Sequence, residues 1–119
     1  MGPHKRFLAW QECHKLVLSV YKATEVFPKH ELYGLRSQAR RAAFSGAVNI
    51  VEGASRKGRN ELRRFLDISL GSLSELEYVL EVAAELGYLR KDVYSMLEAQ
   101  QKRARFFTWK LQASLRPSN

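Results

Sequence analysis

The stretch LRRFLDISLGSLSELEYVLEVAAELG, residues 62–87, decides the fold class. Apolar or small residues recur in it at alternating steps of three and four, which places them on one face of an α-helix. This line consists of Leu62, Leu66, Ser69, Leu73, Leu76, Leu80, Ala83 and Gly87. The periodicity predicts a helix over about residues 60–86.

A second line of mostly apolar residues lies beside the first, and only Glu75 interrupts it. Its members are Phe65, Ile68, Ser72, Val79, Val82 and Leu86. Together the two lines make an apolar arc that is wider than contact with one neighbouring helix requires. This width indicates that part of the helix is buried between subunits.

Three further segments have helical periodicity, over about residues 8–26, 32–54 and 91–115, and none alternates like a strand. The segment 32–54 carries a stripe of small residues, which would let a neighbouring helix approach closely: Ala39, Ala42, Ala43, Gly46 and Ala47. In the last segment we expect Leu97, Gln100, Ala104, Phe107 and Leu111 to share one line. We therefore expect an all-α protein, an up-and-down antiparallel four-helix bundle, with one domain over residues 1–119.

The composition is that of an ordinary globular domain, with 119 residues, 45% of them hydrophobic and 27% charged. No apolar run approaches the roughly 20 residues that cross a bilayer, so no membrane partner is expected. The start of the chain is too short and polar for a signal peptide. A single cysteine, Cys13, cannot form an internal disulfide. These features predict a cytoplasmic protein.

The charge is unevenly distributed along a chain whose net charge is +8. Residues 36–64 hold eight basic and two acidic side chains, whereas residues 65–89 hold five acidic and no basic ones. The tail, residues 90–119, is basic again, with seven basic and two acidic side chains. This pattern fits a surface that binds polyanions, or two complementary patches that join copies of the chain.

The residues that carry a family resemblance are spread along most of the chain. They are Trp10; Phe27 and Pro28; Tyr33, Gly34 and Leu35; Gln38, Arg40, Arg41 and Ala42; the run 49–53; Arg64, Phe65 and Leu66; the run 71–76; and Gly87, Tyr88 and Leu89. In these residues the chain resembles the four-helix bundle proteins encoded in intervening sequences of large-subunit ribosomal RNA. Gly46 departs from the pattern, because we expect proline there in this family, and it predicts a softer bend or looser packing.

The resemblance implies a cytoplasmic bacterial bundle that associates into a ring, a homopentamer, with no known catalytic activity. The accessory variability protein of diversity-generating retroelements is similar more distantly. That protein is thought to contact nucleic acid and a reverse transcriptase through a basic surface. Since this chain resembles the ribosomal branch more, a reverse-transcriptase partner is not carried over.

Basic residues of the second helix and the following connector are the candidate nucleic-acid-binding residues. They are Arg36, Arg40, Arg41, Arg56, Lys57, Arg59, Arg63 and Arg64. No motif for reading bases accompanies them, so we expect RNA, or less favourably DNA, to be held by shape and phosphate contacts. The competing interpretation is a solvated charged face.

A second basic set, Lys102, Arg103, Arg105 and Lys110, lies among aromatic residues that could stack on single-stranded bases, although Phe107 is expected in the core.

A polar stripe at helical spacing runs along the second helix: Gln38, Arg41, Ser45, Asn49 and Glu52. Arg41 and Glu52 are about 16 Å apart along one helix axis, so each is expected to find its partner elsewhere. We interpret the stripe as a hydrogen-bond network that sets helix register and subunit pairing, in preference to a ligand site.

The sequence contains few of the residue patterns that an enzyme active site requires. His14 follows Cys13 directly, which points the two side chains about 100° apart on a helix. No Glu-x-x-His pair and no phosphate-cradling loop occurs. We predict no catalytic residue, no metal, no cofactor and no small-molecule substrate. The alternative to nucleic-acid binding is an oligomeric scaffold, in which Glu75, Glu77, Glu81 and Glu85 meet the arginines of a neighbouring copy.

Overall fold

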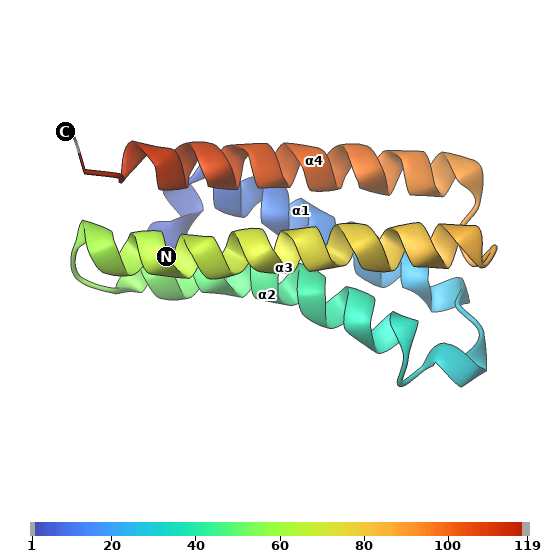
Figure 1. Ribbon diagram of the computed structural model, residues 1–119. Coiled ribbons are helices and arrows are strands. Elements are labelled where there is room, and N and C mark those ends of the chain that lie inside the picture. The colour runs from blue at the N-terminus through green and yellow to red at the C-terminus, as the bar shows by residue number, and fades with distance from the viewer. Residues whose placement is uncertain (1, 118–119) are drawn as a thin grey trace.

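The computed structural model describes residues 2–117, and within that range it contains helices and no strand. The four α-helices are α1 (Leu8–Ala23), α2 (Leu35–Ser55), α3 (Arg59–Glu85) and α4 (Lys91–Ser114). Short 3-10 helices cover Pro3–Arg6 (η1), Thr24–Val26 (η2) and Lys29–Glu31 (η3). The predicted all-helical fold with four helices is confirmed (Figure 1).

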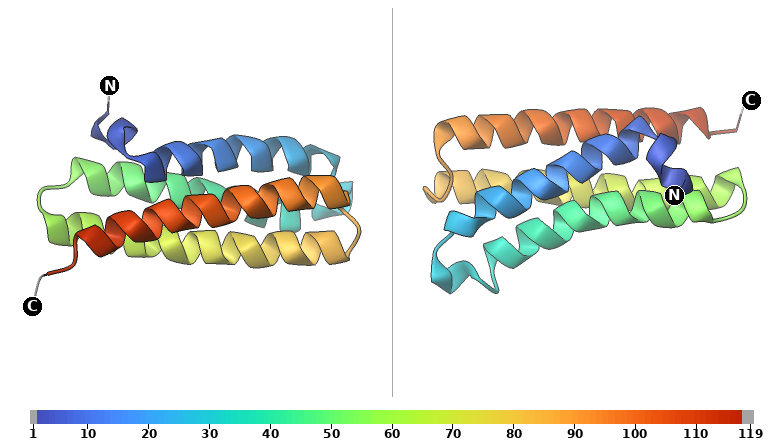
Figure 2. Two further views of the ribbon diagram at one scale, coloured as in Figure 1. Left: turned by 90° about the horizontal axis from the view of Figure 1, so that it is seen from above. Right: turned by 180° about the vertical axis from the view of Figure 1, so that it is seen from behind.

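The helices form an elongated bundle that measures 47 × 25 × 21 Å. Helices that follow each other in the chain run in opposite directions and pack side by side, and α1 also packs against α4 (Figures 1 and 2). One end of the bundle therefore holds η1, the α2–α3 connector and the last turn of α4. The opposite end holds the α1–α2 and α3–α4 connectors.

The first two helices are shorter than the periodicity suggests. The expected helix 8–26 ends as an α-helix at Ala23 and continues as η2, and the expected helix 32–54 begins only at Leu35. Glu31 explains the later start, because its Oε1 accepts the Leu35 backbone N–H at 3.0 Å. This bond and one from the Tyr88 hydroxyl lower the pKa of the Glu31 carboxyl. A side chain before the helix thus satisfies one of its unpaired amides.

The first heptad line of α3 lies in the core, as predicted. Leu66, Leu73 and Leu76 are fully buried, and so is the polar Ser69, whose hydroxyl donates to the Gly46 carbonyl at 2.8 Å. The neighbouring line is only partly covered by this chain, since Ile68 is 42% exposed and Leu86 55%. An apolar strip therefore remains on the outside of α3.

The buried line of α4 differs from the predicted one at three positions, because Gln100, Phe107 and Leu111 are only partly buried. Gln101 faces the core instead and donates to the Leu73 carbonyl at 2.9 Å. Two more polar side chains, Thr108 and Gln112, are also buried on this line. Thr108 bonds its own helix and Gln112 donates to Asp67 Oδ1 at 2.8 Å, so the burial of these polar groups is offset by hydrogen bonds.

The α2–α3 seam is a close contact between helices, in which two positions of α2 are occupied by glycine. A Cβ on Gly46 would lie 2.9 Å from Leu73 Cδ2, and one on Gly53 would lie 2.9 Å from Phe65 Cβ. The expectation of looser packing at Gly46 is therefore wrong, because the missing side chain is what brings the two helices together. Gly58 then reverses the chain with a φ of +91°, a conformation that glycine adopts at low cost.

Adding a methyl group at the seam should destabilise the bundle. Phe65 Cβ is attached to the backbone and cannot rotate away, so Gly53→Ala should lower the free energy of unfolding by about 1–3 kcal/mol. Gly71→Ala on α3 is the matched control, because nothing lies within 4 Å of its added Cβ. It should stabilise by up to about 1 kcal/mol through helix propensity. Chemical denaturation followed by circular dichroism measures both, and equal effects would contradict the seam.

Candidate nucleic-acid interface

The end of the bundle around the last turn of α4 carries an excess of cations from three segments. The cations are Arg6 of η1; Lys57, Arg59 and Arg63 of the α2–α3 region; and Lys110 and Arg116 of α4 and its end. We call these six residues the connector-end surface. Within residues 2–117, none of the six pairs with a carboxylate. Six positive charges therefore remain available to an outside partner.

Arg59 ties the α2–α3 region to the end of α4. Its Nη2 donates to the Ser114 carbonyl at 3.0 Å, one of the last carbonyls of that helix. A cation is favoured there, because the C-terminus of a helix carries partial negative charge. A shallow hollow of about 500 Å³ lies beside this contact, and Lys57, Arg59 and Leu115 are among its lining residues. Arg63 lies one turn further along α3 on the same side as Arg59.

Arg6 and Lys110 extend the same surface to the other side of α4. They line a second hollow, of about 370 Å³, together with Phe7, Leu8 and Ser114. Ser114 thus lies between the two hollows. Arg116 points back along α4 and donates to Gln112 Oε1 at 3.2 Å. Sequence reasoning missed Arg6 and Arg116 and assigned Lys110 to another surface, because these residues are far apart in the chain.

Arg56 and Arg64 of the predicted set lie next to this surface but are partly neutralised. Arg56 pairs with Glu52 at 3.3 Å and Arg64 with Glu61 at 3.1 Å. Both guanidinium groups also lie over the Phe65 ring, 5.4 Å and 4.7 Å from its centroid. Such exposed pairs are weak and exchange readily, so these arginines could turn to a phosphate without a large loss.

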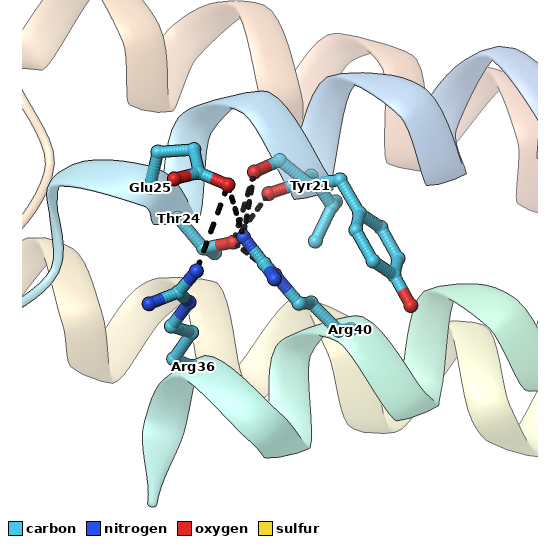
Figure 3. Close-up of polar contacts among 6 residues, drawn as sticks. Tyr21, Thr24, Glu25, Arg36 and Arg40 are labelled. Atoms are coloured by element: carbon cyan, nitrogen blue, oxygen red, sulfur yellow. Dashed lines mark hydrogen bonds and ion pairs between the residues drawn. The ribbon is translucent and has the colours of Figure 1, made fainter. Parts of the chain in front are cut away.

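Arg36 and Arg40 lie at the opposite end of α2, where contacts within the chain hold them (Figure 3). Arg40 donates from Nε to Thr24 Oγ1 at 2.9 Å and from Nη2 to the Tyr21 carbonyl at 3.0 Å. Glu25 lies 3.1 Å from Arg40 and 3.6 Å from Arg36. Arg40 therefore caps the C-terminal end of α1. The predicted set of eight is divided between two ends, and its Arg36 and Arg40 members serve the α1–α2 packing.

The predicted polar stripe on α2 forms a network only at its centre. Ser45 Oγ meets Ser72 Oγ of α3 at 2.7 Å, and Asn49 donates to Ser45 Oγ at 3.1 Å and to the Ser45 carbonyl at 2.8 Å. Contrary to expectation, Glu52 pairs with a residue close to it in the chain, Arg56, which directly follows α2. Arg41 and Gln38 are exposed and take no part in it. The network fixes the register of α2 against α3.

The second basic set is divided in the same way. Arg103 is structural, since its Nε donates to Glu12 Oε1 at 2.9 Å and thereby joins α4 to α1. Its guanidinium lies 5.0 Å from the centroid of Phe107, which is half-buried against the core as expected. Lys102 and Arg105 lie on the α3 side of α4, where Phe106 and Trp109 are exposed.

The histidines and the cysteine do not converge. Cys13 is buried against Thr108, and burial raises the pKa of its thiol to about 11, so it stays protonated at neutral pH. His14 turns outward and stacks on Trp10, with ring centroids 4.8 Å apart. Within the described part of the chain, no three His, Cys, Asp or Glu side chains come together to hold a metal ion. None of the helices in residues 2–117 is long and apolar enough to span a bilayer.

Comparison with known proteins agrees with the fold. The family model described as 23S rRNA-intervening sequence protein matches residues 5–106. Among solved structures, the chain is similar to a crystal structure of a protein with unknown function from the S23 ribosomal protein family of Bacteroides thetaiotaomicron. The two are 16% identical, the alignment covers 89% of this chain and 96% of that one, and the TM-score is 0.81. Comparison with the curated proteins gives no match.

Two arginines that are adjacent in sequence should behave differently when truncated. Arg40→Ala removes the donors to Thr24 and the Tyr21 carbonyl, so it should lower the free energy of unfolding by about 1–2 kcal/mol. Arg41→Ala removes an exposed side chain and should change it by less than about 0.5 kcal/mol. Thermal and denaturant unfolding of both variants provides the measurement. Equal losses would mean that Arg40 does not cap α1.

Proposed function

The chain belongs to the 23S rRNA-intervening sequence protein family, and we propose that it binds nucleic acid through the connector-end surface. It does so as a homo-oligomer in the cytoplasm, without catalysing a reaction. RNA is the nucleic acid that we propose in preference to DNA. The free thiol of Cys13 suits a reducing compartment.

The observation that carries this proposal is the set of six cations without a carboxylate partner. Of the other cations in residues 2–117, eight lie within 4.0 Å of a carboxylate, as Arg36 and Arg40 do with Glu25, whereas Lys22, Lys29, Arg41, Lys91 and Arg105 do not. At the connector end, by contrast, η1, the α2–α3 region and the end of α4 each add positive charge around Ser114. The N-termini of α1 and α3 and the C-termini of α2 and α4 all lie at this end, so the helix dipoles oppose one another and the positive excess comes from the side chains.

These cations suit phosphates more than bases. They come from three separate segments and surround shallow hollows, with no helix or strand raised to enter a groove. Contacts of this kind follow the spacing of backbone phosphates and carry no sequence information directly. Binding should therefore depend strongly on salt, because each neutralised phosphate releases counterions.

Association of several copies would strengthen a weak individual contact. The outer strip of α3 offers a surface for it, since Ile68 and Leu86 are exposed, and Phe44 of α2 is 53% exposed beside Ser45. A ring, a homopentamer by family resemblance, would repeat the connector-end surface in every copy. Modest phosphate attraction per copy would then add up to appreciable affinity.

The alternative function is a scaffold without nucleic acid, and an acidic hollow favours it. Glu77, Glu81 and Glu98 line a depression of about 350 Å³ between α3 and α4, and their charges add to burial in raising the pKa of Tyr94. In this alternative, the hollow receives the connector end of another copy, and the basic surface is covered in the oligomer.

Charge reversal at matched positions separates the two functions. Lys57→Glu/Lys110→Glu changes two exposed connector-end side chains, and Lys29→Glu/Lys91→Glu makes the same change in charge at the opposite end. Fluorescence anisotropy with a structured RNA from about 50 to 200 mM salt measures affinity and its salt dependence. The connector-end variant should bind roughly tenfold more weakly and lower the slope of log affinity against log salt by about two.

The control variant should bind nearly as the unmodified protein does. The mass of every sample is recorded by light scattering. Loss of the oligomer in the connector-end variant, with no RNA binding by the unmodified protein, would favour the scaffold and contradict our proposal. Equal weakening by both double variants would also contradict it, because the effect would then follow total charge and not location.

A further inference from the structure

A hollow between α3 and α4, on a different part of the surface from the connector end, has features of a binding site for a flat polar ligand. Its volume is about 420 Å³. It is lined by Ser74 and Glu77 of α3 and by Gln101, Lys102, Arg105, Phe106 and Trp109 of α4. Aromatic rings, cations and a buried amide thus border one space.

Gln101 provides the most specific observation. Its side chain is 1% exposed, and its Nε2 donates to the Leu73 carbonyl at 2.9 Å. Its Oε1 is buried and accepts no hydrogen bond. The amide cannot be turned over to remedy this, because the Leu73 carbonyl can only accept. A buried acceptor without a donor is costly, so a ligand whose N–H group reached Oε1, with a small shift of the side chains that cover it, would remove a penalty.

Two aromatic side chains of the hollow are exposed. Phe106 is 51% exposed and Trp109 45%, and their ring centroids lie 6.5 Å apart at an angle of 34°. Phe107, by contrast, is half-buried against the core. Exposed, neighbouring rings offer a stacking surface to a planar group such as a nucleobase, and such stacking tolerates any base because every base has a π-face.

Charges around the hollow fit a nucleotide. Arg105 is held near the rim by a 3.3 Å bond from its Nε to Ser74 Oγ, which leaves its terminal nitrogens for a phosphate. Lys102 lies 3.9 Å from Glu98 and can serve the same role. Glu77 places a carboxylate on the α3 side, which suits the amino group of a base and not a phosphate.

We propose that this hollow binds one unpaired nucleobase of an RNA strand, with the ring against Phe106 and Trp109, an N–H group directed to Gln101 Oε1 and a neighbouring phosphate on Arg105. The inference rests on the proposed function, since the connector-end surface supplies the general attraction. Adenine should be preferred to uracil, because it has the larger ring system and an amino group with two N–H donors, whereas the single N–H group of uracil lies between two carbonyl acceptors.

The test uses the full chain with Trp10→Phe, which leaves Trp109 as the single indole of a chain that has two. Quenching of its emission is followed while decamers of adenylate or uridylate are added. The adenylate strand should quench it and bind roughly fivefold more tightly, the effect of one hydrogen bond and better stacking. Phe106→Ala in this background should weaken the adenylate strand roughly tenfold.

Two further variants distinguish binding in the hollow from binding at the connector-end surface. Gln101→Met should bring the two strands within about twofold of each other, by removing the acceptor with little change in volume. Lys57→Glu/Lys110→Glu should weaken both strands equally and leave their ratio unchanged. Circular dichroism verifies that each variant is folded, and if Gln101→Met does not fold, Phe106→Ala, at an exposed position, decides alone.

Failure of this inference is distinguishable from failure of the proposed function. Strands that bind without changing Trp109 emission, and as tightly to Phe106→Ala, overturn the hollow but leave the proposed function standing. If no strand binds, adenosine monophosphate up to about 10 mM tests the hollow by itself, and no quenching then overturns it. Emission that changes on dilution of the protein but not with nucleotide means that a second copy covers the hollow, which also overturns it.

Discussion

The close approach of α2 and α3 at Gly46 and Gly53 is the constraint on which the rest of the structure depends. A Cβ at Gly53 would collide with Phe65 Cβ, which cannot rotate away, and one at Gly46 would force the end of the Leu73 side chain to move, so the two glycines allow the short distance between the helices. The Ser45–Ser72 hydroxyl pair then fixes their register. Because the pair is rigid, the connector that follows Gly53 holds its cations in a defined place at one end of the bundle.

The function of the surface depends on which cations the fold leaves unpaired. Arg40 looks equivalent to its neighbour Arg41 in the sequence, yet it donates to three groups of α1 and η2 and belongs to the framework. Arg103 of α4 likewise belongs to the framework, because it donates to Glu12 of α1. At the connector end the few carboxylates are taken by Arg56 and Arg64. The net charge of the chain alone therefore says little about where nucleic acid binds. The excess of cations over carboxylates at one end of the bundle is more informative.

The sequence predicted the four helices and the core line of α3, because heptad periodicity is a local property that tertiary packing reinforces. It misjudged α4 by one residue at Gln101, Thr108 and Gln112, since the apolar Phe107 and Leu111 favoured the neighbouring line and the hydrogen bonds that allow polar side chains to be buried are not visible in the pattern. It did not predict the cap of α2 by Glu31, which depends on an irregular turn. The meeting of Arg6, Arg59 and Lys110 around α4 depends on three segments distant in the chain, which periodicity cannot place.

Lysine acylation footprinting with and without a structured RNA tests the central claim most directly, because one sample reports on both ends of the bundle. The account predicts that Lys57 and Lys110 are protected by RNA several-fold. Lys29 and Lys91, exposed at the opposite end, should react at an unchanged rate. Protection of Lys29 and Lys91 instead, or equal protection at all four, would contradict the claim that nucleic acid binds the connector-end surface.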